Sequence, residues 1–298
     1  MTAGLIKTVL RVSAWLPLSL LQGVAILVAR LLDMIPNDLR RITRINLGLC
    51  LPELDDAARR RLEQRSLDEA VKTAFELGPV WRWSKRRFST LIHSVSGEDQ
   101  LQRELARGHG VILVAPHLGM WEAVGLYVSI HYPITSLYRP SRVPALDAVM
   151  TEGRQRFGAQ LVPTDASGIR RIYRALARGE VAGLLPDQEP RWGNGVFAPF
   201  FGINAYTMTL LPRLAASSGA AVLLAWAERL PGGRGYDVHF QLLDAECFRH
   251  GLEQAAQYLN STIESRVRKL PEQYQWSYRR FRTAPDNQKY DYYLRGQR

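Results

Sequence analysis

From residue 110 onward, short apolar segments rich in β-branched residues alternate with longer segments whose apolar residues recur at helical spacing. This alternation constrains the fold most strongly, because it predicts strands of one sheet joined by helices that cover its faces. We therefore expect an α/β fold with a mixed, mostly parallel central sheet flanked by helices. The expected strands are 111–115, 134–138, 160–163, 181–185 and 221–228, followed by a hairpin turn at 231–235, and the expected helices are 52–83, 120–128, 146–156, 168–178, 208–218 and 253–269.

The first strand-to-helix turn carries a candidate for chemistry. His117 follows the apolar strand at the end where α/β folds place their ligands. Glu122 lies on the first turn of the next helix, from which we expect it to hold one imidazole nitrogen protonated while the other accepts a proton from a hydroxyl. The alternative is a structural histidine. A zinc site is not supported, because no second histidine lies one helical turn away.

The segment His117–Glu122 resembles the HX4E form of the motif of membrane glycerolipid and lipid A acyltransferases, the lysophospholipid acyltransferase-like superfamily. Its spelling, His-Leu-Gly-Met-Trp-Glu, is similar to that of the late (secondary) lipid A biosynthesis acyltransferases, which add lauroyl or myristoyl chains. Further blocks agree with that family in order and spacing, and together they span most of the chain. They are Leu137–Pro140 with Leu146 and Asp147, Glu152–Arg154, Leu185–Gln188 with Gly195–Gly202, and Pro271–Arg282.

The resemblance implies a glycerolipid acyltransferase-like fold and an acyl transfer that needs no cofactor. An enzyme of this family moves a fatty acyl chain from a thioester of acyl carrier protein, or of coenzyme A, to a hydroxyl of a lipid A precursor of the Kdo-lipid A type. An alkyl hydroxyl holds its proton too tightly to attack unaided at neutral pH, so a nearby base is needed. His117 is the expected base, assisted by Glu122, and the lack of a G-x-S-x-G motif fits direct transfer.

The family blocks also suggest substrate-binding residues. The resemblance places Arg139 and Arg154 near the acceptor, where a guanidinium suits a phosphate or the catalytic carboxylate. Asp187 and Gln188 follow a strand end, and we expect them to bind the sugar or to order Arg154, with a turn cap as the alternative. Three aromatic residues are expected either to line the acyl chain or to belong to the core: Phe197, Phe200 and Phe201.

The formal net charge of +11 at pH 7 predicts an acidic partner. The resemblance favours acyl carrier protein, a phosphoglycolipid acceptor and an anionic membrane. The run 276–282 interleaves aromatic residues with arginines, as in proteins that bind single-stranded nucleic acid, but no nucleic-acid-binding motif accompanies it and we expect no such partner.

A lysophospholipid or an amino-acid lipid is a rival acceptor, although glutamate rather than aspartate in the HX4D/E motif favours lipid A. The two cysteines suggest no disulfide framework.

The N-terminal region is the candidate for membrane attachment. Eighteen uncharged residues run from Val12 to Ala29 between Arg11 and Arg30, and this length makes a spanning or interfacial helix a candidate. The alternative is an ordinary amphipathic packing helix. The basic residues that follow favour the cytoplasmic leaflet. We expect a membrane-anchor helix at 1–36, a single acyltransferase catalytic domain at 37–298, and a location at the bacterial inner membrane with the catalytic domain facing the cytoplasm.

Overall fold

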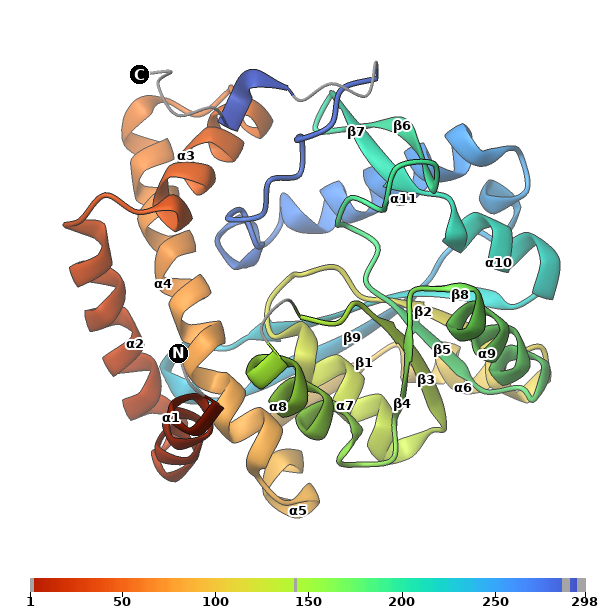
Figure 1. The fold of residues 1–298 in the computed structure, drawn as a ribbon, viewed down its shortest axis with the longest axis horizontal. Coiled ribbons are helices and arrows are strands. Elements are labelled where there is room, and N and C mark those ends of the chain that lie inside the picture. Colours follow the sequence, from red (N-terminus) through yellow and green to blue (C-terminus); the bar gives the residue numbers. More distant parts are fainter. Residues whose placement is uncertain (1–2, 142–143, 286–289, 294–298) are drawn as a thin grey trace.

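The structure is a computed structural model that describes residues 3–141, 144–285 and 290–293. Within these ranges the central element is a seven-stranded sheet with the strand order β1-β9-β8-β2-β5-β3-β4 (Figure 1). Every neighbouring pair is parallel except β8 and β9, so the predicted mixed α/β class is confirmed. The strands are β1 (Ile92–Ser96), β2 (Val111–Val114), β3 (Ile134–Tyr138), β4 (Gln160–Pro163), β5 (Val181–Leu184), β8 (Ala221–Arg229) and β9 (Tyr236–Leu242).

Helices cover both faces of the sheet because successive strand residues point to opposite sides. Ile112 and Val114 pack toward α9, α10 and α11, whereas Val111 and Leu113 pack toward α6, α7 and α8. Both faces of the central strands are therefore apolar, as expected of buried parallel strands. The helices are α3 (Asp38–Cys50), α4 (Asp56–Arg82), α5 (Lys85–Ser89), α6 (Glu98–Ala106), α7 (Trp121–His131), α8 (Pro144–Gln155), α9 (Ala166–Ala177), α10 (Leu210–Ser218) and α11 (Leu252–Val267).

A separate antiparallel hairpin lies above the sheet beside α11 (Figure 1). It consists of β6 (Gly195–Phe200) and β7 (Ile203–Met208). The C-terminal segment passes between this hairpin and α3, and Asn46 of α3 donates to the backbone oxygens of Trp276 and Tyr278 at 2.5 and 2.8 Å. The closing block of the sequence is thus tied to elements far away along the chain.

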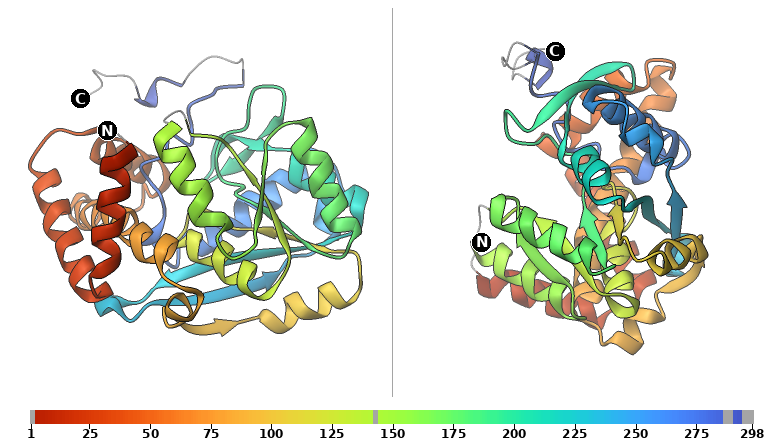
Figure 2. Two further views of the ribbon diagram at one scale, coloured as in Figure 1. Left: turned by 60° about the horizontal axis from the view of Figure 1, so that its bottom comes forward. Right: turned by 90° about the vertical axis from the view of Figure 1, so that its right-hand side faces the viewer.

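The apolar N-terminal stretch is broken rather than continuous, which corrects the expectation of one helix over Val12–Ala29. Helix α1 (Ala3–Trp15) ends before Pro17, and α2 (Leu18–Asp33) begins after it. Proline lacks a backbone N–H and disfavours helical geometry in the preceding residue, so the break falls at this position. Both helices pack beside α4 at one end of the molecule (Figure 2).

No single helix in the described part of the chain has the length and apolar composition needed to cross a membrane. The helices α2 and α3 meet these criteria only as a pair, bent by 85° at the break between them. Leu10 of α1 and Leu21 of α2 belong to the same apolar cluster as Val111 and Leu113 of β2. The division of the chain at residue 36 stays a prediction.

Candidate active site

His117 and Asp187 lie at equivalent positions beyond two neighbouring parallel strands. Val114, the last residue of β2, pairs with Leu184, the last residue of β5, and each polar residue comes three positions later. The backbone N–H of Ala115 donates to the carbonyl of Leu184 at 3.0 Å, which extends the pairing toward the site. The carboxyl ends of parallel strands meet at one edge of a sheet, and open α/β folds place their ligands at this edge.

The carboxylate of Asp187 holds His117 by two contacts. Its Oδ1 lies 2.8 Å from the imidazole Nδ1, and its Oδ2 accepts the His117 backbone N–H at 2.8 Å. An ionised carboxylate only accepts, so Nδ1 carries the proton and Nε2 has a free lone pair. The side-chain Nε2 of Gln188 lies 3.2 Å from this nitrogen, where it donates to the lone pair. His117 is thus held in the tautomer that a general base requires.

The environment keeps Asp187 charged although it is buried. Burial alone would raise the pKa of Asp187, but the electrostatic interaction with the His117 ring and the hydrogen bonds from His117 lower it below its ordinary value. Tyr274 lies close by, and burial followed by the charge of Asp187 raises the pKa of this phenol well above its ordinary value. A neutral phenol therefore lies beside the charged carboxylate that contacts the imidazole.

Glu122 does not hold the imidazole, which corrects the expected pairing of Glu122 with His117. Arg154 donates from both Nε and Nη2 to this carboxylate, and the indole N–H of Trp81 donates to its Oε2 at 3.1 Å. The first turn of α7 directs Glu122 toward α4 and α8, whereas Asp187 lies on the loop that follows β5, the strand beside β2. Burial alone would raise the pKa of Glu122, but Arg154, Trp81 and the nearby imidazole together lower it.

The ion pair of Glu122 with Arg154 depends on the close crossing of α8 and α4. A Cβ added to Gly153 would lie 2.5 Å from Cγ of Trp81, so only glycine allows this approach. Arg154 was expected to contact either the substrate or the catalytic carboxylate, and it makes the second of these contacts. Burial tends to lower the pKa of Arg154, but the charge of Glu122 raises it overall.

The loop that carries His117 is clamped by the C-terminal segment. The carbonyl of His117 accepts the backbone N–H of Gln275 at 3.0 Å, and the N–H of Gly119 donates to the carbonyl of Gln273 at 2.9 Å. Gly119 has a φ of +62°, and a Cβ added there would lie 1.9 Å from the carbonyl oxygen of Ala227. Glycine is therefore required where this loop crosses β8.

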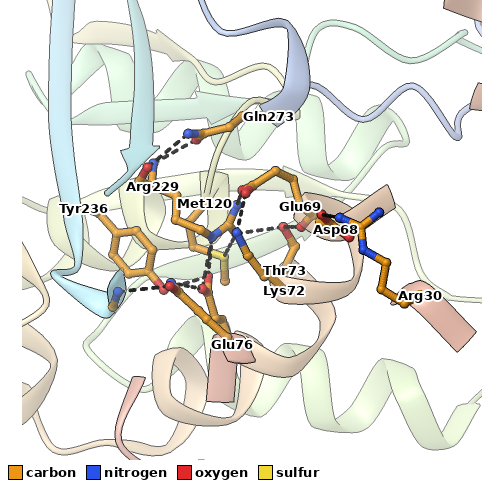
Figure 3. A network of polar contacts seen from close by, with 12 residues as sticks. Arg30, Asp68, Glu69, Lys72, Thr73, Glu76, Met120, Arg229, Tyr236 and Gln273 are labelled. Carbon is orange, nitrogen blue, oxygen red and sulfur yellow. Dashed lines mark hydrogen bonds and ion pairs between the residues drawn. The ribbon is translucent and has the colours of Figure 1, made fainter. Parts of the chain in front are cut away.

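A buried ion network lies between α4, β8 and the loop that carries His117 (Figure 3). Arg229 at the end of β8 contacts Glu76 at 2.9 Å and Glu69 at 2.5 Å, both on α4. Burial tends to lower the pKa of Arg229, but these two carboxylates raise it overall. The Gln273 side chain accepts the backbone N–H of Arg229 at 2.8 Å and donates to its carbonyl at 3.0 Å. The network thus joins α4, β8 and the C-terminal clamp.

Two side chains of this network extend it toward α2 and the loop. Gln22 of α2 donates to Glu76 at 2.8 Å and accepts the backbone N–H of Gly233 at 3.0 Å. Arg229 Nη2 lies 3.8 Å from the sulfur of Met120, the residue before α7. Helix α2 and the loop that carries His117 therefore share one buried set of polar contacts.

A narrow, mostly apolar cavity of about 80 Å³ lies beside Glu122. Its walls are α7 on one side and strands β2, β5, β3 and β4 on the other, and Arg154 of α8 borders it. The indole of Trp121 also lines this space, and its ring lies 4.8 Å from the imidazole of His117 between centroids. The cavity is thus adjacent to the imidazole and to the paired carboxylate.

The remaining predicted residues fall into two groups. Arg139 is exposed on the loop after β3, and in the described ranges it makes no hydrogen bond or ion pair. Phe200 and Phe201 belong to the core cluster on the α11 side, in contact with Tyr274, Trp276 and Phe281, and they do not line the cavity. Of the two alternatives for these phenylalanines, the core is confirmed.

Trp81 and Tyr274 were missed, and Asp187 was given a different role. Asp187 was expected to bind sugar or to order Arg154, but Arg154 is ordered by Glu122 and Asp187 orders His117. A signal was present, because Ala-Pro-His and Leu-Pro-Asp repeat the same pattern after two apolar strands. No cluster of three or more His, Cys, Asp or Glu side chains suited to a metal ion occurs over the residues described.

Comparison with known proteins gives a consistent result. A family described as bacterial lipid A biosynthesis acyltransferase matches residues 2–283. The chain is 30% identical over 249 residues to the lipid A biosynthesis lauroyltransferase of Escherichia coli (strain K12), covering 83% of this chain and 80% of the relative. It is 32% identical over 248 residues to the palmitoleoyltransferase of the same strain, with 82% and 79% covered. The myristoyltransferase of that strain is 23% identical over 282 residues, with 88% and 84% covered.

Proposed function

Since the chain belongs to the bacterial lipid A biosynthesis acyltransferase family and is therefore an acyltransferase, we propose that it moves a fatty acyl chain from acyl carrier protein to a hydroxyl of a lipid A precursor of the Kdo-lipid A type. The observation that carries the mechanism is the double contact of Asp187 with the ring and backbone of His117. This contact leaves Nε2 as the acceptor for the proton of the substrate hydroxyl.

The reaction then proceeds without a covalent enzyme intermediate. His117 Nε2 takes the hydroxyl proton as the acceptor oxygen attacks the thioester carbonyl carbon, and the carbonyl π electrons move onto oxygen. The tetrahedral intermediate collapses, the carbon–sulfur bond breaks, and the departing sulfur receives the proton from the imidazolium. The products are an ester and a free thiol. Asp187 stabilises the imidazolium that forms between these steps, as a carboxylate does for histidine bases generally.

The side chain of Gln188 lies beside His117 Nε2, where the substrate hydroxyl would react. Its side-chain nitrogen occupies the position beside Nε2 that the acceptor hydroxyl must take, so the hydroxyl displaces it. The displaced amide N–H is then free to donate to the oxygen that becomes negative in the intermediate. This role requires a donor close to the base, which the 3.2 Å separation provides.

The acceptor is bound through its phosphate. Arg139 and Arg191 lie on the loops that follow the neighbouring strands β3 and β5, and both are exposed. Neither forms an ion pair within the ranges that the structure describes, so both guanidinium groups are available for bidentate contact with a phosphate.

The enzyme attaches to the cytoplasmic face of the bacterial inner membrane through α2. Leu20, Val24, Leu27 and Leu31 recur at helical spacing, and they are 37–62% exposed. Met34, just beyond the helix, is 80% exposed. A stripe of this kind is typical of a surface that lies in a lipid interface.

The test is direct transfer with defined substrates. Purified protein is incubated with lauroyl, myristoyl or palmitoleoyl acyl carrier protein and a tetra-acylated or penta-acylated lipid A precursor, and the product is weighed by mass spectrometry. We expect the acceptor mass to rise by one acyl group. Parallel reactions with acyl-coenzyme A and with a lysophospholipid acceptor decide between the donors and between the acceptors. Product formed with the lysophospholipid but not with the lipid A precursor would contradict the proposed acceptor.

A further inference from the structure

The apolar cavity beside Glu122 has rows of side chains that can be followed across the sheet. Leu113 of β2 and Ser136 of β3 both pair with Gly183 of β5, so these three residues form one row on the face that α7 covers. Ala115 lies one row closer to His117, and Ile134 lies one row deeper. Rows on one face are two residues apart, which is about 6–7 Å along a strand.

The row at Gly183 borders the cavity with small residues at its centre. Gly183 contributes no side chain and Ser136 contributes only a hydroxymethyl group, between Leu113 on one side and Leu161 on the other. The next row, at Ile134 and Val181, is filled by branched side chains that are 4% and 0% exposed. The space beside Glu122 therefore extends past the row at Gly183 and ends at the row of Ile134 and Val181.

The helix opposite contributes a second glycine at this point. Gly125 lies one turn of α7 after Trp121, and residues four apart share a face of a helix. Both residues line the cavity. A Cβ added to Gly125 would meet no heavy atom within 4 Å, so a side chain there would enter open space.

We propose that this cavity receives the distal part of the acyl chain of the donor, and that Gly125 sets the length of chain accepted. This inference rests on the proposed function, because it assigns a place to the acyl group of the thioester. A narrow apolar space suits a hydrocarbon chain, which has no polar group to satisfy, and it excludes sugar and phosphate groups. The cavity adjoins His117 through Trp121 and Glu122, so a chain that extends from the reacting carbonyl enters at this end.

The test replaces Gly125 by leucine and compares it with a matched substitution. Gly48 in α3 is also a partly exposed helical glycine at which an added Cβ meets no atom within 4 Å, but it does not line the cavity. We expect Gly125→Leu to shift the preferred donor toward shorter acyl chains. For a longer donor, kcat/KM should fall about fourfold for each methylene group that the cavity can no longer bury. Gly48→Leu should keep the length preference of the wild-type enzyme.

A binding measurement separates this inference from the proposed function. The affinities of saturated fatty acids from octanoate to palmitate are measured by equilibrium dialysis for the wild-type protein and both variants. We expect the Gly125→Leu variant alone to bind the longer acids more weakly. If the wild-type protein shows this length-dependent binding but no transfer to lipid A, the cavity assignment stands and the proposed reaction fails.

Three results would overturn the assignment of the cavity. The first is an unchanged donor preference and unchanged fatty-acid binding in a folded Gly125→Leu variant. The second is an equal shift in Gly48→Leu, which would show a general effect of replacing helical glycines. The third is a change in preference for the chains of the acceptor with none for the donor, which would place the acceptor's hydrocarbon in the cavity instead.

Discussion

The carboxylate of Asp187 contacts both the imidazole Nδ1 and the backbone nitrogen of His117, each at 2.8 Å. This double contact fixes the ring and the loop together. Because the two residues follow paired positions of neighbouring strands, the sheet itself sets their separation. The geometry of the pair of His117 and Asp187 is therefore a consequence of the strand order.

Asp187→Asn should remove the orienting group with little change in volume. An amide has one oxygen and one NH2 group, so it cannot accept both N–H groups of His117, and it carries no charge to stabilise the imidazolium. We expect kcat to fall by about 10²- to 10⁴-fold, with a small change in KM for the acyl donor. Steady-state kinetics measures both, and kcat within tenfold of the wild-type value would show that this contact is dispensable.

The pair of Glu122 and Arg154 should show strong coupling in stability. Removal of either partner leaves a buried charge, so we expect Glu122→Gln or Arg154→Met to lower the free energy of unfolding by about 3–5 kcal/mol, and the double variant to lose less than the sum. Urea denaturation measures the cycle. The exposed pair of Arg178 with Glu180 serves as the control, and equal coupling there would contradict a special role for burial.

The same pair sets the direction of a pH effect. The pKa of Glu122 is lowered in the folded state, so its contribution to stability is complete above about pH 4.5, the ordinary value, and is lost as the pH falls through the lower folded pKa. We therefore expect the stability difference between wild type and Glu122→Gln to shrink in acid. A difference that grows as the pH falls would mean that the folded pKa is raised.

Gly119→Ala should damage the catalytic loop more than an alanine at another glycine with positive φ. Gly108 has a φ of +81° but open space around an added Cβ, so Gly108→Ala should cost only about 1–2 kcal/mol for the backbone conformation. Gly119→Ala adds the clash with the carbonyl of Ala227 and must move the loop. We expect a larger loss of stability and at least about tenfold lower kcat for Gly119→Ala. Equal effects would show that the crossing of β8 is adaptable.

The exposed stripe of α2 should control membrane binding without affecting catalysis. Leu27→Ser with Leu31→Ser removes apolar groups that face away from the core, and we expect affinity for phosphatidylglycerol vesicles to fall about tenfold for each leucine. Leu242→Ser, at a leucine 40% exposed on β9, is the matched control. Sedimentation with vesicles measures binding, and transfer to a detergent-dispersed acceptor should stay unchanged. Full binding by the double variant would place the membrane contact elsewhere.

Much of the fold is predictable because the central strands are buried on both faces. Continuous apolar runs such as Val111–Val114 and Val181–Leu184 are recognisable as strands from the sequence. The strand Ile92–Ser96 was missed because it is a polar edge strand, and β6 was missed because Pro199 argues against a strand. Neither segment shows the continuous apolar pattern of a buried strand, so the sequence predicts each of them only weakly.

The candidate site was predicted in part. His117 was placed correctly at a strand end, because that position depends only on local sequence. Asp187 was expected at the site, but its pairing with His117 was not predicted, since the sequence does not reveal that β5 lies beside β2. Contact of Arg154 with Glu122 was one of two predicted alternatives, and the choice between them depends on how α8 crosses α4 at Gly153 and Trp81. Side-chain partners across elements therefore required the three-dimensional structure.

The most direct measurement of the central claim is the single-turnover rate of acyl transfer from lauroyl acyl carrier protein to a lipid A precursor by His117→Ala. His131→Ala, at an exposed histidine ending α7, is the control, and circular dichroism checks the fold of both variants. We predict a loss of at least about 10²-fold for His117→Ala and none for His131→Ala. A folded His117→Ala variant that transfers within tenfold of the wild-type rate would contradict the role of His117 as the base.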